Sequence, residues 1–196
     1  MIGNIKTPAF PVVILAAGLS ERMGLMKPLL KFNEKEIFLS HIIAEYEKLG
    51  SQEIIIVTNE TVVNEIDKTS LRNAEIVINK NPASGRLHSI KIGLNLLKTK
   101  NACFIHNTDN PFVNQPLLHK MTLSVNDNNI VVPVYKGKGG HPILIGRKVI
   151  EHICKQKQTD ADLRELLKYF ERINVQTTDE KILCNINSME DYNKYF

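Results

Sequence analysis

Residues 12–28 read VVILAAGLSERMGLMKP, and the organisation of the whole chain can be worked out from this stretch. Its first four residues, Val12–Leu15, are all apolar, as in a strand that is buried on both faces of a parallel sheet. The strand runs directly into a loop that contains Gly18, Gly24 and several charged residues. A buried strand followed by a long polar loop is typical of the first half of a βαβ unit.

Similar apolar runs alternate with amphipathic helical stretches along the rest of the chain. Further strands are predicted over residues 54–57, 76–78, 102–105, 130–134 and 142–145, with two short ones after residue 170. Helices are predicted over 38–49 with Gly50 as the C-terminal cap, over 60–69, along the stripe of Leu87, Ile90, Leu94 and Leu97, after the turn at 111–116, over 148–155 and 160–170, and after Ser188. This alternation predicts a single α/β domain over residues 1–196, with a mainly parallel sheet covered by helices on both faces.

Composition excludes several other classes of protein. The 196 residues are 43% hydrophobic and 23% charged, which is typical of a folded globular domain rather than a disordered chain. The formal net charge of +4 is compatible with small anionic ligands and gives little support for nucleic-acid binding. The longest apolar run, residues 10–19, is too short to span a membrane, and the three widely spaced cysteines form no metal or redox pair. We therefore expect a cytoplasmic protein with neither a membrane nor a nucleic-acid partner.

Ligands of open α/β sheets bind at the carboxyl ends of the strands. The loops predicted at those ends are residues 17–28, 79–89, 107–112 and 136–141, and all four carry glycines, charges or polar side chains. A binding site is therefore expected at this edge of the sheet.

The first of these loops favours two interpretations. Its opening residues Ala16, Ala17 and Gly18 are small, so that backbone N–H groups can approach a ligand closely, and Arg22 and Lys27 supply donors suited to a triphosphate. The sequence contains neither the Walker A pattern nor G-x-G-x-x-G. Composition alone leaves phosphate binding and a long surface turn equally open.

Five segments, in order, carry a resemblance to a known family. LAAGLSERMGLMKPLL, residues 15–30, resembles the signature L-A-A-G-x-S-x-R-M-G-x-x-K of MobA-like nucleotidyltransferases. GRLHSIKIGL (85–94), Asp109-Asn110-Pro111, Gly140-His141-Pro142 and NINSMED (185–191) are similar to later motifs of that family. The resemblance covers residues 12–192 and implies a Rossmann-like, three-layer nucleotidyltransferase fold, that of the nucleotide-diphospho-sugar transferases.

The resemblance also implies roles for individual residues. Arg22 would hold the β- and γ-phosphates of a nucleoside triphosphate, and Lys27 would reach the α-phosphate. Asp109 would be catalytic and bind Mg²⁺, with Mn²⁺ as an alternative. The remaining nucleotide and substrate contacts implied are Leu15, Ala16, Ala17, Gly18, Ser89 and His141.

A second metal ligand is implied near the C-terminus. Family members with the ending D-I-D offer a carboxylate there, whereas this chain offers the amide of Asn185. Asn185 and Asn187 point to the same side of an extended segment, so either could face the metal. The predicted metal ligands are therefore Asp109 and Asn185, with Asn187 as the alternative to Asn185.

The motifs disagree about the substrates. Ala16-Ala17-Gly18 and the segments at 85–94 and 140–142 resemble the cytidylyltransferase branch, whereas Asn185-Ile186-Asn187 resembles the guanylyltransferase branch, so CTP is favoured over GTP. The first-choice acceptor is a phosphorylated molybdopterin-type cofactor, which also implies a recipient molybdoenzyme as a partner. Asp162 stands where glycine is usual in the family, and its carboxylate could change the choice of acceptor.

Three functions therefore remain open at this level. The preferred one is a Mg²⁺-dependent nucleotidyltransferase that moves CMP from CTP onto the molybdenum cofactor and releases pyrophosphate. The catalytic alternatives are a molybdenum cofactor guanylyltransferase and a sugar- or alditol-phosphate nucleotidyltransferase. The alternative from another class is a non-catalytic nucleotide-binding or cofactor-delivery protein on the same scaffold.

Overall fold

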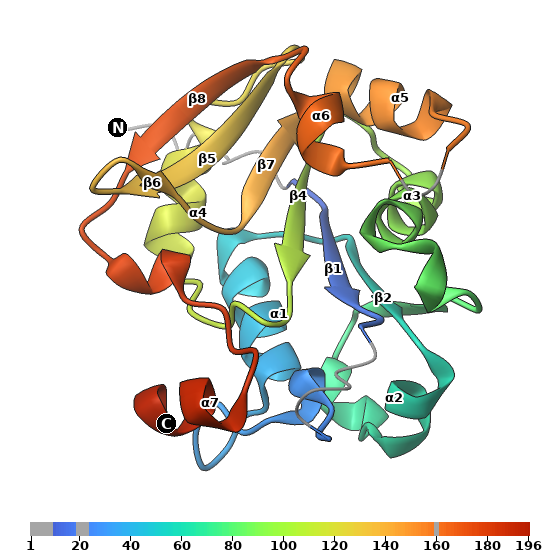
Figure 1. Ribbon diagram of the computed structural model, residues 1–196, viewed down its shortest axis with the longest axis vertical. Coiled ribbons are helices and arrows are strands. Elements are labelled where there is room, and N and C mark those ends of the chain that lie inside the picture. The colour runs from blue at the N-terminus through green and yellow to red at the C-terminus, as the bar shows by residue number, and fades with distance from the viewer. Residues whose placement is uncertain (1–9, 19–23, 159–160) are drawn as a thin grey trace, which may run out of the picture.

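The computed structural model describes residues 10–18, 24–158 and 161–196 and contains an eight-stranded sheet with helices packed around it (Figure 1). The strands are β1 (Val12–Ala16), β2 (Ile54–Thr58), β3 (Glu75–Ile78), β4 (Ala102–Asn107), β5 (Asn129–Tyr135), β6 (Lys138–Gly139), β7 (Ile143–Gly146) and β8 (Glu171–Gln176). The α-helices are α1 (Phe38–Leu49), α2 (Glu60–Glu65), α3 (Arg86–Leu96), α4 (Gln115–Thr122), α5 (Arg147–Lys155), α6 (Leu163–Leu167) and α7 (Met189–Tyr195). Short 3₁₀ helices span Lys27–Leu29, Lys68–Leu71, Pro82–Ser84 and Glu180–Leu183.

The strand order is β3-β2-β1-β4-β7-β5-β6, with β8 paired to β5. The pairs β3–β2, β2–β1, β1–β4 and β5–β8 are parallel, while β7 runs antiparallel to both β4 and β5. Strand β7 is antiparallel to both of its neighbours, so β4 and β5 run in the same direction as each other and as β1. The carboxyl ends of β1, β4 and β5 therefore lie at one edge of the sheet. The segment that enters β7, which contains His141, starts from that same edge.

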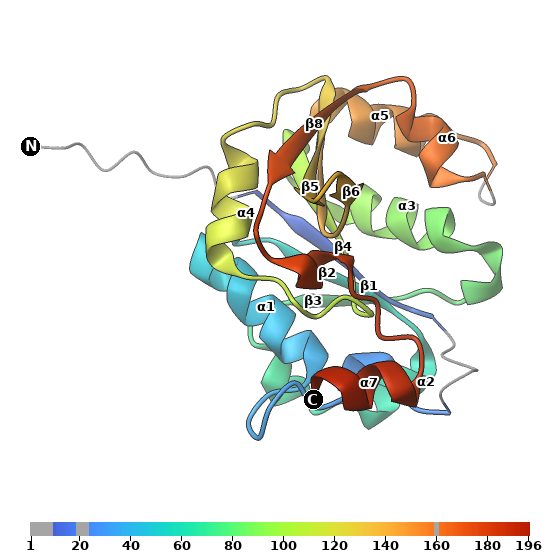
Figure 2. The ribbon, with the colours of Figure 1, turned by 60° about the vertical axis from the view of Figure 1, so that its left-hand side comes forward.

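Alternating side chains divide the core into two layers. Val12, Ile14 and Ala16 of β1 face the layer under α1 and α4, and Val13 faces the layer under α3, α5 and α6. Figure 2 shows these two groups of helices on opposite sides of the sheet. Both faces of the central strands are therefore buried, which explains why their sequences are continuously apolar.

Helix α3 lies unusually close to the sheet. A Cβ atom at Gly93 would collide with the side chain of Val13 and approach Val57 to 3.1 Å. Glycine at this position lets the helix backbone pack directly on β1 and β2. The close packing brings the N-terminal end of α3 next to the carboxyl end of β1.

Most of the predicted elements are confirmed, with three differences. Helix α1 and its left-handed cap Gly50 (φ 96°) match the prediction, and Ser188 caps α7 in a capping box with Asp191. The predicted helix 60–69 is wrong in length, because Ile66 ends α2 in an extended conformation before a 3₁₀ turn. Helix α6 is likewise shorter than the predicted 160–170, and the second short strand predicted after residue 170 is instead the 3₁₀ helix Glu180–Leu183. In the parts of the chain that the structure describes, the helices are too short or too polar to cross a membrane.

Candidate active site

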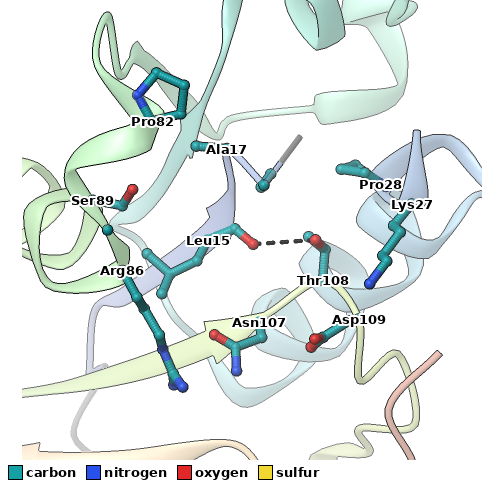
Figure 3. A pocket seen from close by; sticks show the side chains of 13 residues that line it. Leu15, Ala17, Lys27, Pro28, Pro82, Arg86, Ser89, Asn107, Thr108 and Asp109 are labelled. Atoms are coloured by element: carbon teal, nitrogen blue, oxygen red, sulfur yellow. Dashed lines mark hydrogen bonds between the residues drawn. The ribbon is translucent and has the colours of Figure 1, made fainter. Parts of the chain in front are cut away.

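A pocket of about 300 Å³ opens at the carboxyl ends of β1 and β4. Its walls come from the loop after β1, the 3₁₀ turn and start of α3, and the turn after β4. In Figure 3, Pro82 and Ser89 lie on one side of the pocket, while Lys27 and Asp109 lie on the other. The lining residues are Leu15, Ala16, Ala17, Gly18, Lys27, Pro28, Pro82, Gly85, Arg86, Ser89, Asn107, Thr108 and Asp109.

Neighbouring strands hold the backbone of the first loop in place. The carbonyl of Leu15 accepts hydrogen bonds from the backbone N–H and the hydroxyl of Thr108, at 3.2 and 3.1 Å. Thr58 donates to the carbonyl of Ala16, and the side-chain amide of Asn59 donates to that of Ala17. Three successive carbonyls are thus fixed, which gives the start of the loop a defined backbone before any ligand binds.

Lys27 is positioned by the C-terminal segment. Its ammonium group donates a 2.7 Å hydrogen bond to Oδ1 of Asn187, which is 160 residues away in sequence. Asn187 and Ser188 in turn donate backbone N–H bonds to the carboxylate of Asp191 at the start of α7. The last helix therefore contributes to the geometry of a side chain in the pocket.

Asp109 presents a carboxylate oxygen that has no partner. Its Oδ1 is buried and makes no hydrogen bond within the described residues. Burial raises the pKa of Asp109 above its ordinary value, and the positive charges of Lys27 and Arg86 partly oppose this shift. Because a buried carboxylate without a hydrogen bond is costly, this atom is a strong candidate for contact with a cation.

A buried polar network supports the turn that carries Asp109. His106 is fully buried on β4, with its Nδ1 3.0 Å from the hydroxyl of Tyr46 and its Nε2 2.9 Å from the carbonyl of Asn110. Burial lowers the pKa of His106 to about 3, so the ring is neutral at neutral pH. His106 is fully buried, so it supports the turn from beneath and cannot touch a substrate.

The same turn is fastened to the C-terminal segment. The side-chain amide of Asn110 donates to the carbonyls of Ile182 and Cys184, at 3.1 and 2.6 Å, and the backbone N–H of Ile186 donates to the carbonyl of Asp109 at 2.7 Å. The motif that ends β4 and the motif near the C-terminus are thus in direct contact. This contact explains how segments some 75 residues apart act on one pocket.

Ser89 is held on the other side of the pocket by Asn79. The buried amide of Asn79 donates a 2.9 Å hydrogen bond to the Ser89 hydroxyl oxygen. Because that oxygen accepts this bond, its own proton can be donated to a ligand.

Arg86 is a site residue that sequence reasoning missed. It is the first residue of α3, follows Gly85 (φ 87°) and lines the pocket on the side opposite Lys27 (Figure 3). The quoted segment GRLHSIKIGL contains it, but the family pattern leaves this position unspecified. The sequence did contain one indication of this role. Arg86 is a charged residue that directly precedes an apolar helical stripe, in a loop predicted at the carboxyl end of a strand.

A second pocket, of about 750 Å³, lies on the other side of Arg86. It is lined by basic side chains, one carboxylate, His141 and a floor of apolar residues. The charged lining residues are Arg86, Asp162, Arg164, Lys168 and Arg172, and the apolar ones include Ile130, Val132, Ile143, Leu163, Leu167 and Phe170. Four basic groups against one acidic group make this pocket suited to an anionic ligand.

His141 lines this second pocket rather than the first. Its Nδ1 is buried without a hydrogen bond in the described part of the chain, and burial together with the charges of Arg86 and Arg164 lowers its pKa to about 4. The backbone N–H of His141 donates to the carbonyl of Ile182, and a Cβ at Gly140 would collide with that same carbonyl. A glycine is therefore needed before His141 for the segment to pack here.

The structure gathers seven of the ten predicted site residues around the first pocket: Leu15, Ala16, Ala17, Gly18, Lys27, Ser89 and Asp109. His141 lies in the second pocket, and Asn185 is exposed beside the turn that carries Asp109 and lines neither pocket. Arg22 lies outside the described residues. Asp162 caps the short helix α6 by accepting a 2.8 Å hydrogen bond from the backbone N–H of Arg164.

The sheet topology and the pocket at its carboxyl edge place the chain among Rossmann-like α/β proteins of the nucleotidyltransferase fold. Residues 12–177 match the MobA-like NTP transferase domain, so the chain belongs to this family and is a nucleotidyltransferase.

Two sequence relatives and one structure illustrate the family. The chain is 28% identical to a molybdenum cofactor cytidylyltransferase of Escherichia coli (strain K12), over 94% of both chains. It is 27% identical to a probable molybdenum cofactor guanylyltransferase of Carboxydothermus hydrogenoformans, over 93% of both chains. The crystal structure of Rv0371C from Mycobacterium tuberculosis H37Rv, in complex with manganese, shares the fold with a TM-score of 0.75 at 17% identity, covering 95% of this chain and 97% of that one.

Proposed function

We propose that this protein is a Mg²⁺-dependent nucleotidyltransferase that moves CMP from CTP onto a phosphorylated acceptor, with the molybdenum cofactor as first choice. One observation carries the proposal: a pocket at the carboxyl edge of the sheet unites the small residues of the first loop with Lys27 and the unpartnered carboxylate oxygen of Asp109. A nucleoside triphosphate needs this combination of close backbone, cation and metal ligand.

The two sides of the pocket suit the two ends of a nucleotide. The part of the pocket around Pro82 and Ser89 offers an apolar ring and one hydroxyl, and it would receive the base. The side with Lys27 and Asp109 would receive the phosphates, where Lys27 neutralises charge on the α-phosphate. Arg22, in the same loop, would hold the leaving pyrophosphate. Leu15 to Gly18 would lie along the nucleotide between these ends.

The residues present fit a divalent cation that is held partly by the substrate. Within residues 10–18, 24–158 and 161–196, no three His, Cys, Asp or Glu side chains form a metal-binding group. Mg²⁺ often binds to one or two protein carboxylates and takes its other ligands from phosphates and water. Asp109 would be that carboxylate, with the amide of Asn185 as the second protein ligand. When bound, Mg²⁺ would offset the charge of the triphosphate. The neighbouring structure in complex with manganese is compatible with the use of a divalent ion.

The choice of CTP rests on the motifs. The cytidylyltransferase and guanylyltransferase relatives are almost equally similar to this chain, so identity does not separate the two bases. Ala16-Ala17-Gly18 and the segments around Ser89 and His141 favour CTP, while Asn185-Ile186-Asn187 keeps GTP as the alternative.

The second pocket would hold the acceptor. Its apolar floor suits a flat ring system, its basic rim suits a phosphate, and the neutral ring of His141 offers a buried Nδ1 for a hydrogen bond. The carboxylate of Asp162 caps α6, and the four basic side chains of the same pocket offset its repulsion of an anionic acceptor. These features support a molybdopterin-type acceptor, and with it a cytoplasmic reaction and a recipient molybdoenzyme.

The proposed reaction needs no general base. A phosphate monoester is largely a dianion at neutral pH, so an oxygen of the acceptor's phosphate can attack the α-phosphorus directly. A new P–O bond forms, the bond from the α-phosphorus to the oxygen bridging to the β-phosphate breaks, and its electron pair leaves on pyrophosphate. The task of the protein is then to align two anions and neutralise their charge.

Pyrophosphate release tests this proposal. We would compare CTP, GTP, ATP and UTP with Mg²⁺, each with and without molybdopterin, in the wild type, Lys27→Ala and the control Lys31→Ala, which alters an exposed lysine four residues away. We expect release that requires both CTP and molybdopterin, a loss of about 100-fold or more in Lys27→Ala, and wild-type turnover in Lys31→Ala.

If pyrophosphate is released with GTP and with none of the other three nucleotides, the transferred group would be GMP and not CMP. The protein could instead bind the nucleotide and release no pyrophosphate, whether molybdopterin, a sugar phosphate or an alditol phosphate is offered as the acceptor. That result would identify a non-catalytic binding protein.

A further inference from the structure

Arg86 lies on the boundary between the two pockets. Among the described residues, Gly85 and Arg86 are the two that line both of them. The side chain is exposed, so a ligand in either pocket can reach it. In Figure 3 the guanidinium extends past Leu15, on the side of the pocket opposite Lys27.

Within the described residues, no protein anion is bound to the guanidinium of Arg86. Arg72 pairs with Glu47 and Arg147 pairs with Asp127, both at 2.6 Å, but Arg86 makes no ion pair or side-chain hydrogen bond within the described parts of the chain. Surrounding protein atoms lower the pKa of Arg86 by desolvation, an effect that the carboxylates of Asp109 and Asp162 oppose and the charge of Arg164 reinforces. An arginine stays charged in proteins, so its five N–H donors at this boundary remain available to an anion.

The chemistry of nucleotidyl transfer favours a cation at this boundary. An acceptor phosphate that enters from the second pocket must approach the α-phosphate in the first, and these two anions repel each other. Lys27 lies on the far side of the nucleotide pocket, where it would serve the phosphates of the nucleotide. A planar guanidinium can bind two oxygens of one phosphate and so fix the direction of the third.

We propose that Arg86 is a catalytic residue that binds the attacking phosphate of the acceptor through two parallel hydrogen bonds and directs its third oxygen at the α-phosphorus. This inference rests on the proposed nucleotidyl transfer and adds to it the group that selects phosphorylated over neutral acceptors. Lys27 then serves the nucleotide and Arg86 the acceptor, with the transferred phosphorus between them.

The chain offers a matched control. Arg147 is also the first residue of a helix that follows a glycine cap, but it pairs with Asp127 and lines neither pocket. We would compare Arg86→Gln, Arg86→Lys and Arg147→Gln in steady-state kinetics with CTP, Mg²⁺ and molybdopterin. For Arg86→Gln we expect a KM for molybdopterin at least tenfold higher and a kcat about 100-fold lower, with the KM for CTP within threefold of the wild type. Arg86→Lys should recover part of the loss, and Arg147→Gln should keep wild-type kinetics.

A binding measurement separates this inference from the proposed function. With Mg²⁺ and saturating α,β-methylene-CTP, whose bridging carbon cannot be displaced, we would follow the shift in Tm caused by inorganic phosphate at constant ionic strength. We expect phosphate to raise the Tm of the wild type and Arg147→Gln, with an apparent Kd at least tenfold weaker in Arg86→Gln.

Equal phosphate affinity in Arg86→Gln and the wild type would overturn the role of Arg86, as would equal losses in the KM values for CTP and molybdopterin. Phosphate binding that depends on Arg86, in an enzyme that transfers no nucleotide, would overturn the proposed function and leave the anion site standing.

Discussion

Asp109, the residue that we propose as the metal ligand, lowers the stability of the fold. Its buried Oδ1 has no hydrogen-bond partner in the described structure, and its pKa is raised because burial disfavours the charged form. A folded pKa above the unfolded value means that the folded state holds a proton more tightly than the unfolded state. Stability therefore falls as the pH rises through that interval, and at neutral pH the charged carboxylate weakens the fold.

We predict that Asp109→Asn strongly lowers turnover and raises Tm. The amide removes the buried charge, so thermal unfolding at pH 7 without metal should occur at a higher temperature than in the wild type. Pyrophosphate release should fall by about 100-fold or more, because an amide is a poor substitute for a carboxylate ligand of Mg²⁺. Wild-type turnover in this variant would contradict the role of Asp109 as the metal ligand.

At the residue scale, the pocket could largely be predicted from the chain, and the reason is topological. Lys27 and Asp109 follow strands predicted from local sequence, and parallel strands bring their carboxyl ends together. Arg86 could not be identified in this way, because what distinguishes this residue is its position between two pockets. That property depends on how α6 and β5 close around α3, which no local pattern encodes.

At the scale of elements, the C-terminal segment acts as a brace for the site. Asn110 holds the carbonyls of Ile182 and Cys184, while Asn187 holds Lys27. Behind the segment, Phe38, Phe112 and Ile186 form a small separate core against which Tyr192 and Tyr195 of α7 pack. The C-terminal segment therefore fixes both the turn that carries Asp109 and the side chain of Lys27.

We predict that Asn110→Ala destabilises the protein by about 2–4 kcal/mol, because one buried and one partly buried carbonyl lose their donor. Turnover should fall as well, since the turn carrying Asp109 loses its attachment. Asn114→Ala, which removes only the capping bond of Asn114 to α4, is the control and should cost about 1 kcal/mol with turnover retained. Urea unfolding and pyrophosphate release would be measured for both variants. Equal effects of the two substitutions would refute the supporting role of the C-terminal segment.

The elements also show where prediction from sequence stops. Strands β1 to β4 were predictable because each contains a short apolar run that ends at a turn or loop. Helix α1 was predictable from its apolar spacing and its cap Gly50, and α3 from the stripe of Leu87, Ile90 and Leu94. The reversal of β7 was not, since the sequence of a strand does not state its direction or its neighbours. The same reversal carries His141 into the second pocket and away from the nucleotide residues with which its motif had grouped it.

For the molecule as a whole, buried neutral histidines predict sensitivity to acid. His106 and His141 have pKa values lowered to about 3 and about 4, below the ordinary value of 6.5. As the pH falls below 6.5, these two histidines become protonated in the unfolded chain but stay neutral in the folded protein. Stability should therefore fall by up to about 1.4 kcal/mol per pH unit for each histidine.

Urea unfolding between pH 6.5 and pH 4.5 checks this expectation. His106→Asn should be less stable than the wild type at neutral pH, because it loses the contacts to Tyr46 and Asn110, yet its stability should depend less steeply on pH. A slope equal to that of the wild type would show that His106 does not resist protonation in the folded state.

The most direct test of nucleotidyl transfer at the carboxyl edge of the sheet is to follow the fate of the α-phosphate. CTP labelled at the α-phosphorus, or separately at the γ-phosphorus, would be incubated with the enzyme, Mg²⁺ and molybdopterin, and the products separated. We predict that the α-label appears in the modified acceptor and the γ-label in pyrophosphate, and that Asp109→Asn strongly lowers both. Transfer of the γ-label to the acceptor, or α-label recovered only as CTP or free CMP, would contradict nucleotidyl transfer by this site.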